Sequence, residues 1–269
     1  MRTTLVRTLN WAQNRGMPAT QSTETRDPVE FHWLGDIVRV NLDENARGSV
    51  LSYGNEDWNW THFDARVRKC VTGIRSDRLQ RGEHVAVLAR NHPVHFETLF
   101  AASNMGLVCT WVDWRLDPAY LVRALNEAEA RILFVGEEFL DVVEDRGLEL
   151  ASVVSTITVG GPEDEYEEWL ETHETHESLL RAAREVATSS IRPDDPVLRL
   201  YSSVGKKGPT RGEYTHRALL ASASETLRRK GLSRGDIEAV DEPMTGHEAA
   251  VRVLANMSAG ATTVLVQED

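Results

Sequence analysis

The alternation of helical and strand-like segments between residues 61 and 135 most constrains the fold of this chain. Residues 61–79 carry apolar side chains at helical spacing, and residues 84–89 form an apolar run with the length of a buried strand. The same alternation then repeats with short joints. The expected elements are helices over 61–79, 93–106 and 117–130, and strands over 84–89, 107–113, 131–135, 156–159 and 197–201.

This alternation predicts an α/β fold with a doubly wound, mostly parallel sheet and helices on both faces. Local signals support the boundaries: Asp117 and Pro118 form an N-cap followed by proline at the first helical position, and Gly106 ends the helix before it. In sheets of this kind, ligands bind beyond the carboxyl ends of the strands. Candidate functional residues are therefore sought where strands end.

Composition excludes several classes of protein. The net charge of −12 argues against binding to nucleic acid, which needs a basic face. No apolar run reaches the ~20 residues of a membrane span, and the polar N-terminus does not have the pattern of a signal peptide. The cysteines are Cys70 and Cys109, both in apolar surroundings. We expect buried free thiols in a reducing, cytoplasmic compartment.

Two pairs of histidines have a spacing that metal sites use. His173 and His176 lie in the acidic stretch 162–177, which we expect to be a solvated helix or loop because its carboxylates cannot be buried together. Exposed histidines on a wet helix are the favoured interpretation, since no third ligand is identifiable nearby. For His92 and His95 a capping or packing role is favoured in the same way.

The segment 201–217, YSSVGKKGPTRGEYTHR, is the main candidate site. It follows an expected strand and precedes an expected helix with Thr215 as N-cap, so the expected order is strand, loop, helix. Glycines let backbone N–H groups converge on an anion, and hydroxyl and cationic side chains add donors and charge. It is not a common P-loop, because Gly205-Lys206 is followed by Lys207 rather than Ser or Thr. The alternatives are a phosphate-binding loop and a basic surface turn. The candidate phosphate-binding residues are Ser202, Ser203, Gly205, Lys206, Lys207, Gly208, Thr210 and Arg211.

The same segment resembles the phosphate-binding signature of the AMP-forming adenylation enzymes, which include acyl-CoA synthetases, luciferases and nonribosomal peptide adenylation domains. Residues 201–203, 209 and 213–217 match the signature without a gap. Residues 58–116, 128–135 and 243–266 are similar to further family segments in the family's order, including Asp113-Trp114-Arg115-Leu116. The resemblance implies an N-terminal lead-in over 1–30, a partial AMP-binding domain over 31–269, and an AMP-forming acid–thiol ligase that uses ATP and Mg²⁺.

Departures from the family pattern bear on activity. The resemblance implies relatives that run on for nearly as long again beyond Asp269. The family's Thr-Thr-Gly loop core is replaced by residues 204–207, the aromatic-His pair expected after Pro243 is missing, with His247 displaced, and no glutamate matches the magnesium ligand. We therefore expect a truncated ligase homologue that is inactive alone, with at most residual ATP or phosphate binding.

Two other interpretations remain open from the sequence. One is a non-enzymatic interaction or regulatory protein on the same scaffold, and the other is one half of a split ligase completed by a second polypeptide. A truncated sheet should leave apolar surface uncovered, which predicts either that complementing partner or a homo-oligomer. No catalytic residue and no metal ligand is assigned.

Overall fold

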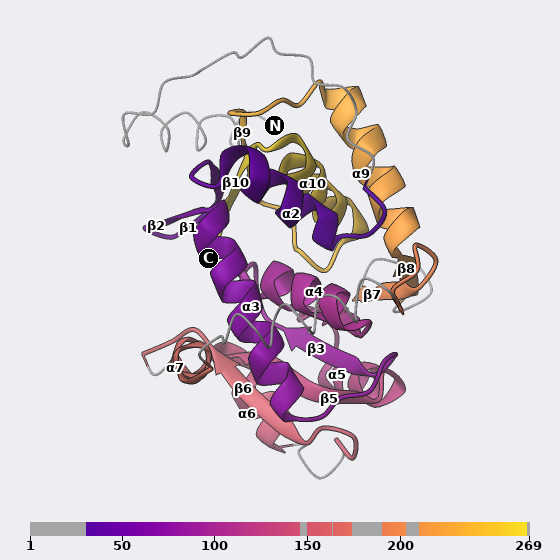
Figure 1. The fold of residues 1–269 in the computed structure, drawn as a ribbon. Helices are drawn as coiled ribbons and strands as arrows, with labels where there is room; N and C mark the ends of the chain where they lie inside the picture. Colours follow the sequence, from indigo (N-terminus) through magenta and orange to yellow (C-terminus); the bar gives the residue numbers. More distant parts are fainter. Residues whose placement is uncertain (1–30, 146–149, 163, 174–189, 203–209, 268–269) are drawn as a thin grey trace.

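The computed structural model describes residues 31–145, 150–162, 164–173, 190–202 and 210–267. Within them the chain forms two sheets with helices packed between and around them (Figure 1). The first elements are α2 (Gly35–Asn45), β1 (Ser49–Tyr53), β2 (Glu56–Asn59), α3 (Trp60–Ser76), β3 (His84–Leu88), α4 (Val94–Met105), β4 (Val108–Val112) and α5 (Pro118–Glu127). They are followed by β5 (Ala130–Gly136), η1 (Glu137–Phe139), α6 (Leu140–Asp145), β6 (Ser155–Val159) and α7 (Glu165–Thr172). The last are β7 (Pro196–Ser202), β8 (Thr210–Thr215), α9 (His216–Lys230), β9 (Ile237–Val240), α10 (His247–Ala259) and β10 (Thr262–Leu265).

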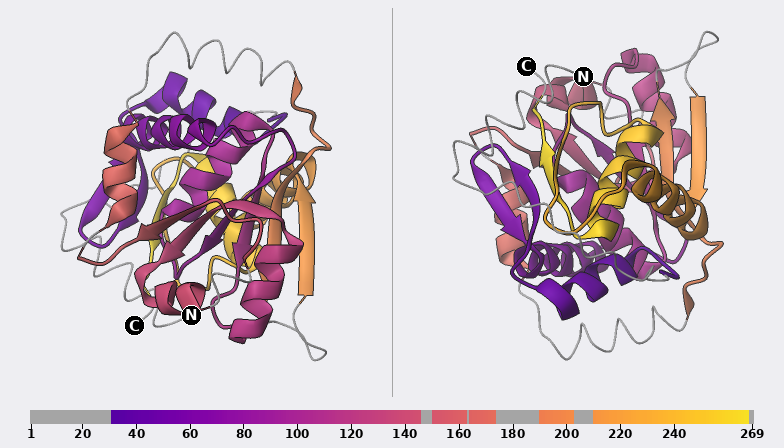
Figure 2. Two further views of the ribbon diagram at one scale, coloured as in Figure 1. Left: turned by 90° about the horizontal axis from the view of Figure 1, so that it is seen from below. Right: turned by 90° about the horizontal axis from the view of Figure 1, so that it is seen from above.

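The larger sheet has six strands in the order β6-β5-β3-β4-β7-β8. All neighbours in it are parallel except β7 and β8, which pair antiparallel at one edge (Figure 2). The central strands are buried on both faces, as their continuous apolar runs predicted. One face packs against α3 and α4, and the other against α5 and α6. The predicted mostly parallel sheet with helices on both faces is confirmed.

A second sheet was not anticipated. It has four strands in the order β2-β1-β10-β9, with β1, β10 and β9 parallel and β2 antiparallel to β1. Nothing in the sequence indicated a second sheet, because β1 and β10 are far apart along the chain and neither has a local pattern that specifies its partner. In the second sheet, the residues that follow β9 and β10 are hydrogen-bonded to Asn91, which follows β3 of the larger sheet.

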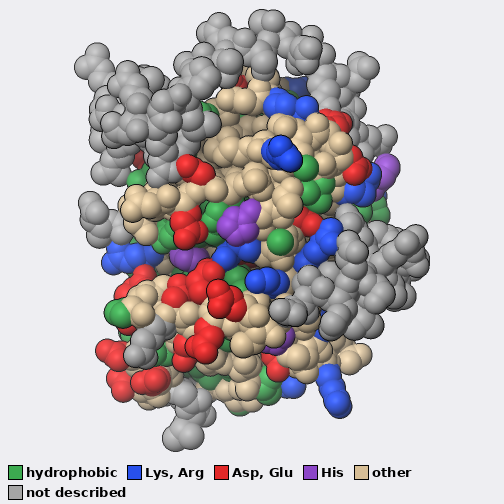
Figure 3. Space-filling view, turned by 60° about the vertical axis from the view of Figure 1, so that its left-hand side comes forward, with side chains coloured by type: hydrophobic (Ala, Val, Ile, Leu, Met, Phe, Trp, Pro, Cys, Tyr) green, Lys and Arg blue, Asp and Glu red, His purple; other side chains and the backbone are tan. Residues whose placement is uncertain are grey.

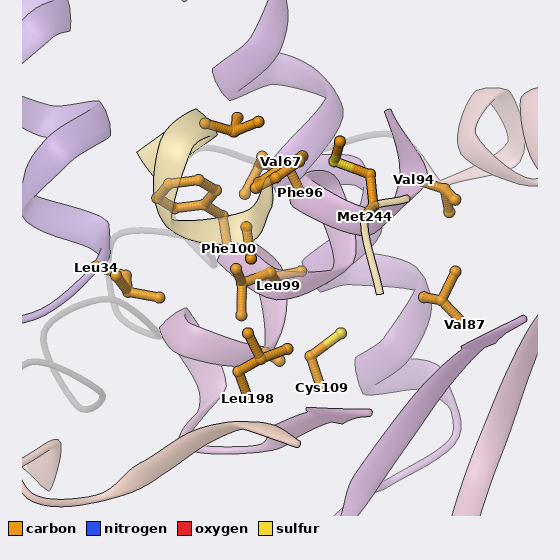
Figure 4. Packing of buried hydrophobic residues seen from close by; sticks show 14 of the residues in the cluster. Leu34, Val67, Val87, Val94, Phe96, Leu99, Phe100, Cys109, Leu198 and Met244 are labelled. Carbon is orange, nitrogen blue, oxygen red and sulfur yellow. The ribbon is translucent and has the colours of Figure 1, made fainter. Parts of the chain in front are cut away.

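The main hydrophobic core is shared by the two sheets and the helices between them. Figure 4 shows Leu99 of α4 near Cys109 and Leu198 of the larger sheet, with Phe100 and Met244 farther from those two strands. Because these side chains are fully or almost fully buried, α4 is covered on nearly all sides. This explains why the helix has no wholly polar face, and why even its polar residues His95, Glu97 and Thr98 are buried.

The helix ends follow the expected local chemistry. The Asp117 side chain accepts a hydrogen bond from the backbone N–H of Ala119, which confirms it as the N-cap of α5. Gly106 and Gly231 end α4 and α9 in the left-handed conformation, which glycine adopts without a steric penalty. Helix α5 ends at Glu127, slightly earlier than the predicted residue 130.

Candidate nucleotide site at the carboxyl edge of the larger sheet

The candidate phosphate loop connects two paired strands rather than a strand and a helix. Strand β8 follows the loop and pairs with β7, with Ser202 opposite Thr210, and α9 begins only at His216. The expected strand–loop–helix order is therefore wrong in this detail. Alternation within 210–215 is too short to distinguish a strand from a loop in the sequence alone.

The structure places the two ends of the loop but not its centre. Ser202 is the last residue of β7, and Thr210 and Arg211 open β8. The backbones of Ser202 and Thr210 are paired at the carboxyl end of a parallel strand, and Arg211 is exposed. The remaining candidate phosphate residues, Ser203, Gly205, Lys206, Lys207 and Gly208, lie outside the described residues, so their assignment stays a prediction.

The hairpin that carries the loop is fixed at its base. Arg199 of β7 forms an ion pair with Glu213 of β8, with a shortest N–O distance of 2.5 Å. Thr215 caps α9 by accepting from the Ala218 backbone N–H, as predicted. The ring Nδ1 of His216 accepts from the backbone N–H of Leu34, and burial lowers the pKa of His216 to about 4. The imidazole is therefore neutral and ties α9 to the segment before α2.

Next to the loop, the end of β4 presents a buried carboxylate and an arginine. The backbone N–H of Asp113 donates to the carbonyl of Tyr201 at 2.8 Å, which sets Asp113 beside the last residues of β7. The fully buried Asp113 carboxylate accepts two bonds of 2.8 Å from the Arg115 guanidinium and one from the Arg115 backbone N–H. Trp114, the residue between them in the sequence, stacks on Phe139 of η1.

Asn91 joins the carboxyl ends of the two sheets. Its side-chain amide donates to the carbonyls of Glu242 and Val266, and its carbonyl accepts from the backbone N–H of Met244 at 2.9 Å. Residue 91 follows β3 in the larger sheet, whereas the other three residues follow β9 and β10 in the smaller one. Because Asn91 is only 2% exposed, these bonds are shielded from water and hold the two edges in a fixed relation.

His92 and His95 have the capping and packing roles that were favoured, whereas His173 is half-buried rather than exposed. His92 Nδ1 accepts from the Val94 backbone N–H at the start of α4, and His95 packs edge-on against Trp111. Burial lowers the pKa of His95 to about 4. His173 bonds to the Trp169 carbonyl through Nδ1, while His176 lies outside the described residues. In the part of the chain that the structure describes, no group of His, Cys, Asp and Glu side chains is arranged to hold a metal ion.

The acidic stretch is partly solvated and partly built into the core. Figure 3 shows Asp and Glu side chains gathered on one part of the surface, and Glu165, Glu168 and Glu171 are exposed. Tyr166 and Leu170, however, are buried. The stretch that contains helix α7 was expected to be a solvated helix or loop. The apolar residues four positions apart, Tyr166 and Leu170, were the signal that could have indicated a buried face.

A buried charge network holds α7 against α3 and α4. Arg66 of α3 is bonded to the fully buried Glu97 of α4 and makes a two-pronged contact with Glu167 of α7. The hydroxyl of Tyr166 donates to Glu97 at 3.0 Å. Sequence reasoning missed this network, because partners 31 and 101 residues apart share no local pattern. Burial raises the pKa of Glu97, and Arg66 opposes that shift.

Both cysteines are buried free thiols, as predicted. Among the described residues, the exposed large hydrophobic side chains are Tyr120 and Val154, and the expected complementing partner or homo-oligomer stays a prediction. No helix in the described ranges has the length and apolar character needed to cross a membrane.

Comparison with known proteins identifies the family. The AMP-binding enzyme family matches residues 39–269. The chain belongs to that family.

Individual AMP-binding enzymes are similar over part of their length. A 3-methylmercaptopropionyl-CoA ligase of Ruegeria lacuscaerulensis is 27% identical over 219 residues, which cover 80% of this chain and 39% of the relative. A peroxisomal trans-cinnamate:CoA ligase of Petunia hybrida is 25% identical over 199 residues, covering 68% and 35%. The chain thus spans well under half the length of these curated relatives.

Solved structures show the same fold. The N-terminal domain of FACL13 from Mycobacterium tuberculosis superimposes with a TM-score of 0.77 at 17% identity, over 89% of this chain and 58% of that one. A long-chain-fatty-acid-CoA ligase from Archaeoglobus fulgidus gives 0.74 at 19% identity, over 93% and 50%. The predicted resemblance to acyl-CoA synthetases is confirmed, and the match is to their N-terminal part.

The histidine that departs from the AMP-binding family pattern after Pro243 is His247, and the structure shows its position and its contact. His247 is the first residue of α10, and its ring stacks on Tyr214 of β8 with centroids 4.7 Å apart. The imidazole therefore links α10 to the hairpin that carries the candidate phosphate loop. This contact gives the displaced histidine a packing role of its own.

Proposed function

We propose that this chain is the nucleotide-binding part of an acyl-CoA ligase-like protein, and that residues 202–211 bind the phosphates of Mg·ATP. The observation that carries the proposal is the β7–β8 hairpin. It carries the two ends of the candidate loop, Ser202 and Thr210, at the carboxyl edge of a mostly parallel sheet, the edge where such sheets bind ligands. Membership in the AMP-binding family supports ATP and Mg²⁺ as the ligands.

The altered loop favours weak binding rather than full activity. Adenylation requires ATP and a carboxylate to be held in line while the phosphate charge is neutralised. Lys206 and Lys207 supply charge, but lysine ammonium groups are point charges without the fixed geometry of directed hydroxyl donors. We therefore propose that the 269-residue polypeptide binds nucleotide without forming acyl-CoA on its own, at a cytoplasmic location suited to its two free thiols.

The test is calorimetric titration of the folded chain with Mg·ATP. We expect saturable binding in the wild type and its loss in the Lys206→Ala/Lys207→Ala variant. The control is Arg228→Ala/Arg229→Ala, which removes the same charge from the last turn of α9. Equal affinity in the wild type and the loop variant, or no heat from a folded sample, would contradict the proposal.

The second proposal is that ligase activity needs the remaining part of the family fold in addition to these residues, for example from a complementing polypeptide. It is supported by coverage, since the chain spans 39% of the curated relative from Ruegeria lacuscaerulensis. The measurement is acid-dependent pyrophosphate release from ATP after this chain and the complementing polypeptide are mixed. Complex formation without any nucleotide binding would instead favour an interaction protein on the same scaffold.

A further inference from the structure

The carboxyl edge of the larger sheet carries two arginines around one indole ring. Arg90 follows β3, and Trp114 and Arg115 follow the adjacent strand β4. The guanidinium carbons of Arg90 and Arg115 lie 4.8 and 5.9 Å from the centre of the Trp114 ring. We call these three residues the arginine–tryptophan platform.

Each part of the platform is held in place by a separate contact. Trp114 stacks on Phe139 with ring centres 5.9 Å apart, and the Asp113 carboxylate accepts two hydrogen bonds from the Arg115 guanidinium. Arg90 faces Glu138 at 3.4 Å, a longer and looser pair. Both arginine side chains are nevertheless about one-third exposed, at 36%. Fixed guanidinium groups at a solvent-accessible edge are a geometry that suits phosphate oxygens.

The platform is also next to the end of β7. The bond from the Asp113 N–H to the Tyr201 carbonyl sets Asp113, the partner of Arg115, beside the last residues of β7, which include the candidate phosphate residue Ser202. The carboxylates of Glu138 and Asp113 orient the two guanidinium groups and offset their charge. An anion on the exposed side would add a charge-assisted contact to these oriented groups.

We propose that Arg90 and Arg115 form a second anion-binding wall, which contacts the polyphosphate chain of the ligand alongside Ser202. This inference rests on the proposed function, because the ligand is the same nucleotide. It adds two residues that the phosphate signature does not contain. It would also give a physical reason for the proposed binding by a loop whose hydroxyl-rich core is replaced, since guanidinium donors would supply part of the phosphate contact.

The experiment measures the dissociation constants of Mg·ATP and of inorganic tripolyphosphate for matched variants. We expect Arg90→Gln and Asp113→Asn/Arg115→Gln each to weaken both ligands about tenfold. The double change avoids leaving the buried Asp113 carboxylate without its arginine. The control is Arg123→Gln on α5, an arginine that is 70% exposed and paired with Glu127. Circular dichroism and the urea midpoint show whether each variant is folded.

The outcomes separate the two proposals. If the wild type binds ATP and the loop lysines matter but the platform variants bind as the control does, the platform is structural only and the inference is overturned. If the wild type binds tripolyphosphate in a platform-dependent way but not ATP, the proposed function fails, and the contact of the two arginines with a nucleotide is overturned with it. If it binds neither, both fail.

Discussion

Removing the Asn91 side chain should destabilise the protein far more than an ordinary asparagine substitution. In Asn91→Ala the carbonyls of Glu242 and Val266 lose their side-chain donor, and the buried N–H of Met244 loses its acceptor. A net hydrogen bond contributes about 1 kcal/mol, and a stranded buried N–H costs about 1–3 kcal/mol. We expect the free energy of unfolding to fall by about 3–5 kcal/mol, a large part of the ~5–15 kcal/mol of a typical domain.

The matched control is Asn59→Ala. Asn59 caps α3 through one exposed bond to the His62 backbone N–H, so its loss should cost only about 1 kcal/mol. Both variants are compared with the wild type by urea unfolding followed by fluorescence and circular dichroism. The reasoning is refuted if Asn91→Ala shifts the midpoint no more than Asn59→Ala at an unchanged slope. Asn91→Asp distinguishes shape from bonding, since a carboxylate keeps the size but cannot donate to the two carbonyls.

Three further predictions concern buried polar groups. Burial lowers the pKa of His216 to about 4. The stability that depends on the neutral imidazole, about 3 kcal/mol, is therefore fully present above pH 6.5 and is lost as the pH falls through 4. Over this range the urea midpoint of the wild type should drop more steeply than that of His216→Gln. Glu97→Ala leaves Arg66 without its buried partner and should lower the unfolding free energy by about 3–5 kcal/mol, and an unchanged urea midpoint would show that the pair is dispensable. Burial raises the pKa of Cys109 to about 12 and that of Cys70 well above its usual range, so a thiol reagent should label both only in denaturant; fast labelling of the native protein would contradict their burial.

The elements that were predicted from sequence are those with strong local signals. Helix α3 and strand β3 were predicted because apolar periodicity acts over a few residues. The cap at Asp117 and the helix end at Gly106 were predicted for the same reason. Capping bonds join residues only a few positions apart, so the sequence contains both partners in one short window.

The parts that were missed depend on distant partners. The second sheet requires β1 to lie beside β10, more than two hundred positions along the chain, and nothing local in either strand specifies that pairing. The Asn91 bonds and the Arg66–Glu97 pair are of the same kind. In the candidate site, family resemblance supplied the loop residues, whereas Arg90 and the orientation of Arg115 became visible only when adjacent strand ends were placed side by side.

Hydrogen exchange of the backbone amides of residues 201–217, with and without Mg·ATP, tests the central claim most directly. Phosphate held by this loop should slow exchange in peptides that span 202–211, and the slowing should be absent in the Lys206→Ala/Lys207→Ala variant. Peptides from α7, which packs against α3 and α4 rather than against the loop, serve as the internal reference. Nucleotide binding with unchanged exchange in 202–211, or protection confined to other segments, would contradict the account.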